Sequence, residues 1–148
     1  MRVCIASDHA GFELKAKVIG LLKDLTYEVT DLGPFSLDPV DYPDYGLQVA
    51  NSVAKKEHHM GVLICGTGLG MSYTANKVKG IRAALCTNEF MARMAKEHND
   101  ANILVLGARV VGLDLALSIT QVFFNTPFSK SERHIKRIKK ITGYEESC

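Results

Sequence analysis

The sequence lacks the features that mark a membrane or secreted protein. No apolar run reaches the length of a membrane-spanning helix, because Lys, Arg, Asp or Glu interrupts each one. The first residues lead directly into a strand-like segment, with no charged region followed by a long apolar stretch and a cleavage site. We therefore expect a protein of the cytoplasm that does not enter a membrane.

Cysteine is scarce, and its spacing excludes two further classes of protein. The four cysteines lie far apart without a CxxC pair, at Cys4, Cys65, Cys86 and Cys148. This spacing argues against a zinc site and against a dense disulfide framework. All four are expected to be free thiols, with Cys4 and Cys86 inside strands and Cys148 in a solvated tail.

A large excess of one charge is also absent. The 148 residues carry a net charge of +2, and the most basic stretch is confined to the C-terminal segment. A nucleic acid would need a broad basic surface, so any anion that the protein binds is expected to be small. With 47% hydrophobic and 23% charged residues, the composition is that of one globular domain over residues 1–148.

Apolar runs rich in β-branched residues alternate with amphipathic stretches along the whole chain, which is typical of βαβ units around a parallel sheet. The expected strands are residues 2–7, 27–31, 61–65, 81–86 and 102–106. The expected helices are residues 14–25, 43–56, 71–78, 89–97, 113–124 and 132–141. On the first helix, Lys15, Lys17 and Lys23 are expected to form the solvated face. The pattern predicts an α/β fold with a five-stranded parallel sheet covered on both faces.

The residues that follow each strand are the candidates for a site, because ligands of open parallel sheets bind beyond the carboxyl ends of the strands. They are Asp8 and His9, Cys65 with the glycine-rich segment behind it, Thr87 and Asn88, and Gly107 and Arg109. The longest irregular segment, residues 33–42, is a candidate rim or lid.

The segment Cys65-Gly-Thr-Gly-Leu-Gly70 joins an apolar strand to a helix, so its backbone N–H groups can converge on an anion. A nucleotide-binding P-loop would need a lysine that this segment lacks. A dinucleotide-binding loop stays open because Glu89 is suitably placed, although Met71 stands where the third glycine belongs. A receiver domain would need an aspartate in place of Cys65, and a cysteine phosphatase would need an arginine in place of Met71.

Cys65 itself has two interpretations. A cysteine at a strand end is more often a small buried hydrophobic residue. A thiol at the N-terminus of a helix, however, has its thiolate stabilised, and its ordinary pKa of about 8.5 is expected to fall toward neutrality. The second interpretation makes Cys65 a reactive base.

Five ordered motifs resemble the ribose-5-phosphate isomerase B family, whose scaffold is shared by galactose-6-phosphate isomerase subunits. They are Ser-Asp-His-Ala-Gly at 7–11, Asp-Tyr-Pro-Asp-Tyr at 41–45, Cys-Gly-Thr-Gly-Leu-Gly at 65–70, Glu-His-Asn-Asp-Ala-Asn at 97–102 and Gly-Ala-Arg-Val-Val-Gly at 107–112. The resemblance implies a Rossmann-like three-layer αβα sandwich in a single domain. It also implies an aldose–ketose isomerase that interconverts ribose 5-phosphate and ribulose 5-phosphate without a metal or an organic cofactor. Hexose 6-phosphates (allose or galactose) as substrates, and a non-catalytic nucleotide-binding module, stay open as alternatives.

The resemblance also implies roles for individual residues. One branch of the family takes its base from a glutamate where Met71 stands, so Cys65 is expected to transfer the carbon proton and His98 to open the sugar ring. The expected substrate contacts are Asp8, His9, Gly66, Thr67, Gly68, Leu69, Gly70, Asn99, Arg109, Arg133 and Arg137. Backbone N–H groups of the glycine-rich segment would hold the enediolate, and the arginines with His9 would hold the phosphate. Asp8 would contact sugar hydroxyls or orient His9, and Tyr42 would either line the rim or simply pack against its neighbours.

The resemblance also implies a homodimer with active sites shared between the subunits. Some members of the family are tetramers. The helix at 132–141 is expected to carry Arg133 and Arg137 into the partner's site, although a solvated basic face is the plainer interpretation of its lysines. The chain departs from the family at Ser131-Glu132, where a Gly-Gly pair commonly precedes the phosphate-binding arginine, and this leaves the approach of Arg133 open. No role is evident for the other histidines: His58 and His59, which are expected to be exposed, and His134.

Overall fold

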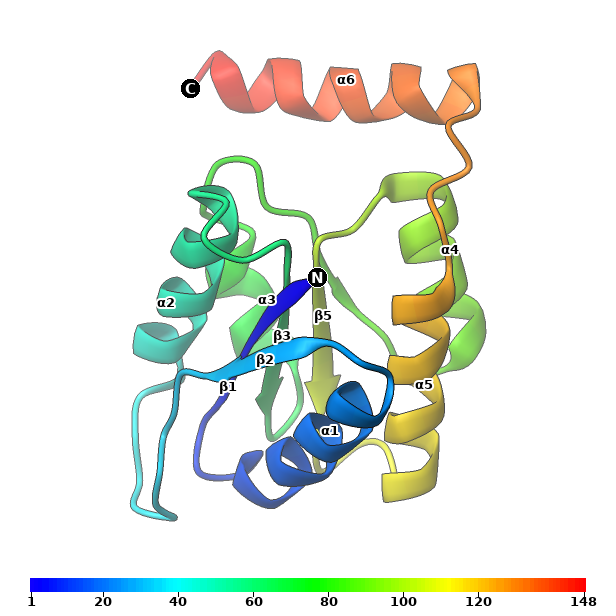
Figure 1. Ribbon diagram of the computed structural model, residues 1–148. Coiled ribbons are helices and arrows are strands. Elements are labelled where there is room, and N and C mark those ends of the chain that lie inside the picture. Colours follow the sequence, from blue (N-terminus) through cyan, green and yellow to red (C-terminus); the bar gives the residue numbers. More distant parts are fainter.

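The computed structural model describes residues 1–148 and contains a parallel sheet with helices on both faces (Figure 1). The strands are β1 (Arg2–Ser7), β2 (Glu28–Asp31), β3 (Met60–Cys65), β4 (Ala83–Leu85) and β5 (Ile103–Gly107). All five strands are parallel and lie in the order β2-β1-β3-β5-β4. The predicted α/β class and five-stranded sheet are confirmed. Strand β4 is shorter than predicted, because only these three residues pair with β5.

Six helices surround the sheet. They are α1 (Phe12–Asp24), α2 (Tyr42–Ala54), α3 (Leu69–Ala75), α4 (Glu89–Asn99), α5 (Leu113–Asn125) and α6 (Glu132–Glu146). Residues of α1, α4 and α5 share one core cluster, and residues of α2 and α3 share the other, so the sheet separates two helical layers. This arrangement confirms the three-layer sandwich.

Strand β3 lies in the middle of the sheet, and all six of its residues are buried. Its side chains alternate between the two cores: Val62 and Ile64 pack with α1, α4 and α5, whereas Leu63 and Cys65 pack with α2 and α3. A central strand covered on both faces is continuously apolar for this reason. The period of two places the Cys65 side chain on the α2 and α3 side.

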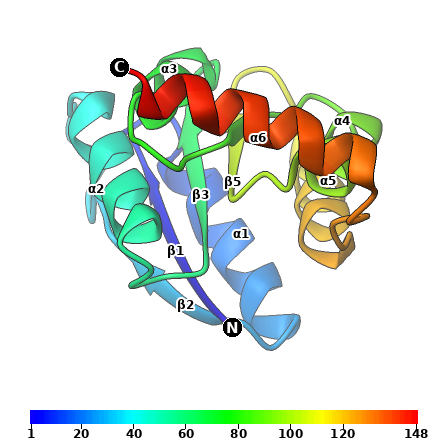
Figure 2. The ribbon, with the colours of Figure 1, turned by 90° about the horizontal axis from the view of Figure 1, so that it is seen from above.

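Helix α6 belongs to neither layer. It crosses the edge of the sheet at which the strands begin, with α4 under its first turns (Figures 1 and 2). It buries only one of its residues, His134. Near its start the Ser129 N–H donates to the Glu97 carbonyl at 3.0 Å, and near its end the Glu145 carboxylate accepts the Gly80 N–H at 2.9 and 3.0 Å. Few contacts therefore hold this helix on the body of its own chain.

Candidate active site

Three neighbouring strands end side by side and bring the residues behind them together. Ser7 of β1 pairs with Ile64 of β3, and Cys65 of β3 pairs with Gly107 of β5. The backbone continues this pairing beyond the strands, because the Asp8 N–H donates to the Ile64 carbonyl at 3.0 Å and the Arg109 N–H to the Gly66 carbonyl at 2.9 Å. The ends of β1, β3 and β5 thus form one edge, which we call the thiol edge: Asp8, His9, residues 65–70 and Arg109.

The Cys65 sulfur differs from the other buried sulfurs in its hydrogen bond. It accepts the Gly68 N–H at 3.1 Å. The thiols of Cys4 and Cys86 instead donate to backbone carbonyls, and burial raises the pKa of both to about 12. A backbone donor stabilises negative charge on an acceptor, and the Gly68 N–H is such a donor to the Cys65 sulfur.

The glycine-rich segment needs glycine for two separate reasons. Gly68 has φ +80°, and a Cβ there would lie 2.4 Å from Cδ1 of Leu85. Gly70 lies under the ring of Tyr42, where a Cβ would be 2.5 Å from Cζ. The left-handed turn at Gly68 also starts α3 at Leu69, two residues before the predicted start. The Tyr42 ring packs on Gly70, and its role in lining the rim of a site stays a prediction.

Three N–H groups of the segment are free. Those of Gly66, Thr67 and Gly70 have no acceptor within the chain, whereas those of Gly68 and Leu69 bond to Cys65 Sγ and Thr67 Oγ1. Thr67 is exposed. The free N–H groups therefore lie next to the sulfur at the surface, where they could donate hydrogen bonds to an oxygen of a ligand.

The side chains beside the segment come from β1 and from the turn after β5. Arg109 covers Gly66, with Cδ and Nη1 each 3.6 Å from the point where a Cβ of Gly66 would lie. Asp8 is buried and accepts the Gly11 N–H at 3.1 Å. Of the two roles expected for Asp8, orienting His9 is wrong, because no hydrogen bond joins the two side chains, and contact with sugar hydroxyls stays a prediction. His9 Nδ1 instead accepts the Val40 N–H at 3.3 Å and so contacts the rim segment.

Lys15 anchors the start of that rim segment, and the prediction that it lies on a solvated face is wrong. The residue is 2% exposed, and its Nζ donates to Oδ1 of Asp31 at 2.8 Å and to the Pro34 carbonyl at 2.7 Å. The rings of Phe12 and Phe35 lie 5.4 Å from the same nitrogen. A carboxylate, a carbonyl and two aromatic faces compensate for the loss of water around this charge.

His98 and Asn99 lie at the other edge of the sheet. They end α4, and a helix that connects parallel strands runs back to the edge at which the strands begin. Arg82, just before β4, fixes this helix end by donating to the carbonyls of Asn99 at 2.7 Å and Asp100 at 2.8 Å. Gly61 of β3 pairs with Ile103 at the edge where the strands begin, and it lies about 13 Å from Cys65 along the strand.

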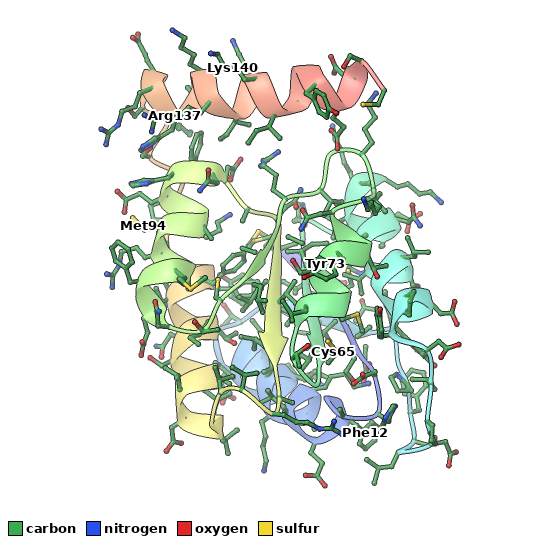
Figure 3. All side chains as sticks on the ribbon, turned by 180° about the vertical axis from the view of Figure 1, so that it is seen from behind. Phe12, Cys65, Tyr73, Met94, Arg137 and Lys140 are labelled. Carbon is green, nitrogen blue, oxygen red and sulfur yellow. The ribbon has the colours of Figure 1, made fainter.

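Arg133 and Arg137 lie on α6 at the same edge as His98. Figure 3 shows Arg137 at one end of the molecule and Cys65 toward the other. Both arginines are exposed and have no carboxylate within ion-pairing distance. Together with His98, Asn99 and His134 they form what we call the imidazole edge.

Ser131 and Glu132, which the sequence marked as a departure before Arg133, adopt ordinary backbone conformations. Ser131 is the extended N-cap of α6, with φ −61° and ψ 136°, and Glu132 begins the helix. The residue with positive φ is the preceding Lys130, at φ 54°. Neither Ser131 nor Glu132 adopts the left-handed conformation that favours glycine, and the effect of this pair on phosphate binding by Arg133 stays a prediction.

Sequence reasoning missed His134. This residue is 3% exposed, and its ring stacks on that of His98 with centroids 4.2 Å apart and a tilt of 30°. Its Nδ1 lies 2.7 Å from the Ser129 hydroxyl. Burial lowers its pKa, and the neighbouring His98, Arg133 and Arg137 lower it further. The sequence signal that could have found it is the amphipathic pattern of α6, which places His134 on the inner face of the helix although Arg133 is its neighbour in sequence.

Of the other two histidines, His59 is exposed as predicted, whereas His58 is half-buried and hydrogen-bonded to Ser52 and Thr30. Asn88, a strand-end candidate, caps α4 by accepting the Met91 N–H at 2.9 Å. No group of three His, Cys, Asp or Glu side chains is arranged to bind a metal ion. No helix combines the length and the apolar character that a membrane span requires.

One chain therefore contains two separate halves of the predicted site. The thiol edge unites Cys65 with Asp8, His9, the glycine-rich segment and Arg109. The imidazole edge unites His98 and Asn99 with Arg133 and Arg137. The sheet lies between them, so the predicted base and the predicted ring-opening group cannot reach the same small molecule within one chain.

Known proteins match this chain over nearly its whole length. The sequence model of the ribose/galactose isomerase family matches residues 3–141. The structure of Clostridium thermocellum ribose-5-phosphate isomerase B is 53% identical in sequence, with a TM-score of 0.97 over 99% of both chains. Ribose-5-phosphate isomerase B of Mycoplasma genitalium, solved with bound ribulose-5-phosphate, is 42% identical, with a TM-score of 0.95 over 99% of this chain and 97% of that chain. Ribose-5-phosphate isomerase B of Escherichia coli (strain K12) is 41% identical over 98% of this chain and 97% of its own length. The chain belongs to the ribose/galactose isomerase family and is an aldose–ketose isomerase.

Proposed function

We propose that the enzyme interconverts ribose 5-phosphate and ribulose 5-phosphate in a homodimer whose active sites each combine the thiol edge of one subunit with the imidazole edge of the other. The observation that carries the proposal is the division of the site between opposite edges of one sheet. Near full-length similarity to ribose-5-phosphate isomerases B supports the substrate pair.

The reaction begins with ring opening, which is the task of His98. Its imidazole accepts the proton of the anomeric hydroxyl while the bond between C1 and the ring oxygen breaks, and it then returns a proton to the ring oxygen. The products are the C1 aldehyde and a free hydroxyl on C4. Histidine suits this exchange because its ordinary pKa of about 6.5 allows both protonation states near neutral pH.

The second step moves hydrogen between carbons, and Cys65 is the base. Its thiolate takes the proton from C2 as the C1 oxygen becomes an enediolate oxygen, and the thiol then returns a proton to C1. The hydroxyl proton on O2 moves to O1, which leaves the C2 carbonyl of the ketose. The hydrogen bond from the Gly68 N–H supports the negative sulfur, and the free N–H groups of Gly66 and Thr67 are suited to the enediolate oxygen.

Phosphate binding falls to the arginines. Arg133 and Arg137 are four residues apart on α6 and therefore share one helical face. Neither has a carboxylate partner in its own chain, and the same holds for Arg109 on the thiol edge. Unpaired guanidinium groups are available for charge-assisted hydrogen bonds to phosphate oxygens.

The exposed apolar surface supports a dimer. It includes Leu69 and Tyr73 on α3, Phe90 on α4, and Ile141 and Tyr144 on α6, each at least 46% exposed. A cavity of about 810 Å³ lies between the end of α6 and the body of the chain. A twofold axis can cover such surface with a second copy and set the thiol edge of each subunit against the imidazole edge of the other, because in an isologous interface residue i contacts j and residue j contacts i.

The test is an isomerase assay without added metal on the intact protein and on Cys65→Ala, with Cys148→Ser as the matched control. We expect turnover of ribose 5-phosphate by the intact protein and by Cys148→Ser, and a loss of about 10²- to 10⁴-fold in Cys65→Ala. Undiminished activity of Cys65→Ala would remove Cys65 from its role. Faster turnover of allose or galactose 6-phosphate would change the assigned sugar. A melting temperature that rises with nucleotides but not with sugar phosphates, together with no isomerase activity, would reject catalysis.

A further inference from the structure

The buried His134 has no task in the reaction described above, and its surroundings do not suit a residue that only fills space. Its Nε2 is inaccessible to water and has no hydrogen-bond partner. Leaving such a group unpaired in a protein interior is unfavourable, and an apolar side chain would avoid the cost. It is also the single buried residue of α6.

A closed chain of contacts connects His134 to His98. The Ser129 N–H donates to the carbonyl of Glu97, the residue before His98, at 3.0 Å. The Ser129 hydroxyl lies 2.7 Å from His134 Nδ1, and the His134 ring stacks on that of His98 with centroids 4.2 Å apart and a tilt of 30°. One serine therefore fixes both the segment that carries His98 and the ring that covers it.

Stacking orients His98 without using its nitrogens. No hydrogen bond of His98's ring is present in the chain, and the nearest carboxylate oxygen, of Glu97, is 3.8 Å from Nε2. A hydrogen-bonding partner would hold one ring nitrogen in one protonation state. A ring that both accepts and returns a proton at the substrate instead needs its nitrogens free and its plane fixed.

We propose that His134 is a positioning residue for ring opening, which holds the His98 imidazole in the orientation that reaches the substrate in the partner subunit's thiol edge. This inference rests on the function proposed above. Desolvation lowers the pKa of His134, and the facing groups are His98 and Glu97 on α4 and Arg133 and Arg137 on α6. Its ring is consequently neutral near neutral pH and does not repel the imidazolium that forms on His98 during the reaction.

The open-chain product makes a test specific for ring opening. Ribulose 5-phosphate cannot close a five-membered ring, because its C5 oxygen carries the phosphate. Exchange of its C1 hydrogen with deuterium from D₂O therefore needs Cys65 but not ring opening, whereas consumption of ribose 5-phosphate needs both. The two rates are measured by NMR for the intact dimer and for His134→Asn, His134→Phe and Lys139→Ala, with circular dichroism and sedimentation to verify fold and dimer.

We expect His134→Asn to lower kcat for ribose 5-phosphate by roughly ten- to a hundredfold while C1 exchange changes by less than about twofold. His134→Phe keeps a stacking ring and should recover most of the lost rate, and Lys139→Ala should match the intact protein. The inference is overturned if both rates fall together in His134→Asn, if neither falls, or if phenylalanine gives no recovery. Absence of both C1 exchange and ribose 5-phosphate consumption in the intact protein would instead reject the proposed function itself.

Discussion

The two edges of the sheet are built in different ways. At the thiol edge, Cys65 and Asp8 are buried, and backbone hydrogen bonds continue the pairing of three strands into the loops. At the imidazole edge, Arg133 and Arg137 are exposed on a helix that buries only His134 in its own chain. The thiol edge is thus preformed by the core, whereas the imidazole edge depends on a few contacts and on whatever covers α6.

This difference follows from the chemistry that each edge is proposed to perform. Proton transfer at carbon needs a base and oxyanion donors in fixed positions, and the ends of buried strands provide that rigidity. Phosphate binding and ring opening use long or exposed side chains that reach across to another molecule. On this proposal each edge alone is an incomplete site, and the following measurements test the roles assigned to the two edges.

The largest expected effect is recovery of activity from two inactive chains. Cys65→Ala damages only the thiol edge and His98→Asn only the imidazole edge, so a mixed dimer retains one intact site. Co-expression of equal amounts should restore about a quarter of the intact activity per subunit, because half of the dimers are mixed and each has one working site of two. Activity is measured with ribose 5-phosphate.

A matched control keeps both changes on the same edge. Co-expression of Cys65→Ala with Arg109→Ala leaves every site of the mixed dimer damaged, so no recovery is expected. Equal recovery from both pairs, or none from the first pair, would mean that the two edges do not combine between subunits.

A smaller effect is expected from the phosphate-binding arginines. Arg137→Ala removes a guanidinium group proposed to bind the phosphate, so KM for ribose 5-phosphate should rise roughly 10- to 100-fold with a lesser change in kcat. Lys139→Ala removes a charge from the same helix and should change KM little. Steady-state kinetics at fixed ionic strength distinguish the two, and equal effects would indicate only a general basic field.

The smallest effect concerns pH and the attachment of α6. The pKa of His134 is lower in the folded chain than its ordinary value of about 6.5. As the pH falls past this value, the unfolded chain therefore binds more protons at this residue than the folded chain does. The contribution of the neutral His134 to the free energy of unfolding is complete above about pH 6.5 and is lost as the pH falls below this value. The melting temperature should fall less between pH 7.5 and pH 5.5 in His134→Phe than in the intact protein. An equal or larger fall in the variant would contradict this prediction.

Much of the fold could be predicted because periodicity is a local property. Alternating runs located all five strands, and β1 was predicted with its observed bounds. The same pattern placed Cys65 at the end of β3 and Gly68 and Gly70 in the turn behind it. The strand order β2-β1-β3-β5-β4 was not predicted, because no pattern along the chain states which strands become neighbours.

The site was predicted as a list of residues but not as an arrangement. Lys15 follows the spacing of a solvated helix face, yet Asp31 and Pro34 come from a separate segment and make its burial favourable. His134 stands among lysines and arginines, yet the crossing of α6 over α4 turns it onto His98. Both errors arose because burial depends on what packs against a residue, and that partner lies elsewhere in the sequence.

The sequence by itself determined the alternation of strands and helices, the parallel sheet, and the chemical groups available at strand and helix ends. Only the tertiary structure decided that Cys65 and His98 lie at opposite edges and that His134 covers His98. The physical reason is one of range. Backbone periodicity and glycine conformations are set by neighbouring residues, whereas the direction of each helix relative to the sheet, and the contacts of α6, are set by packing between segments far apart in the chain.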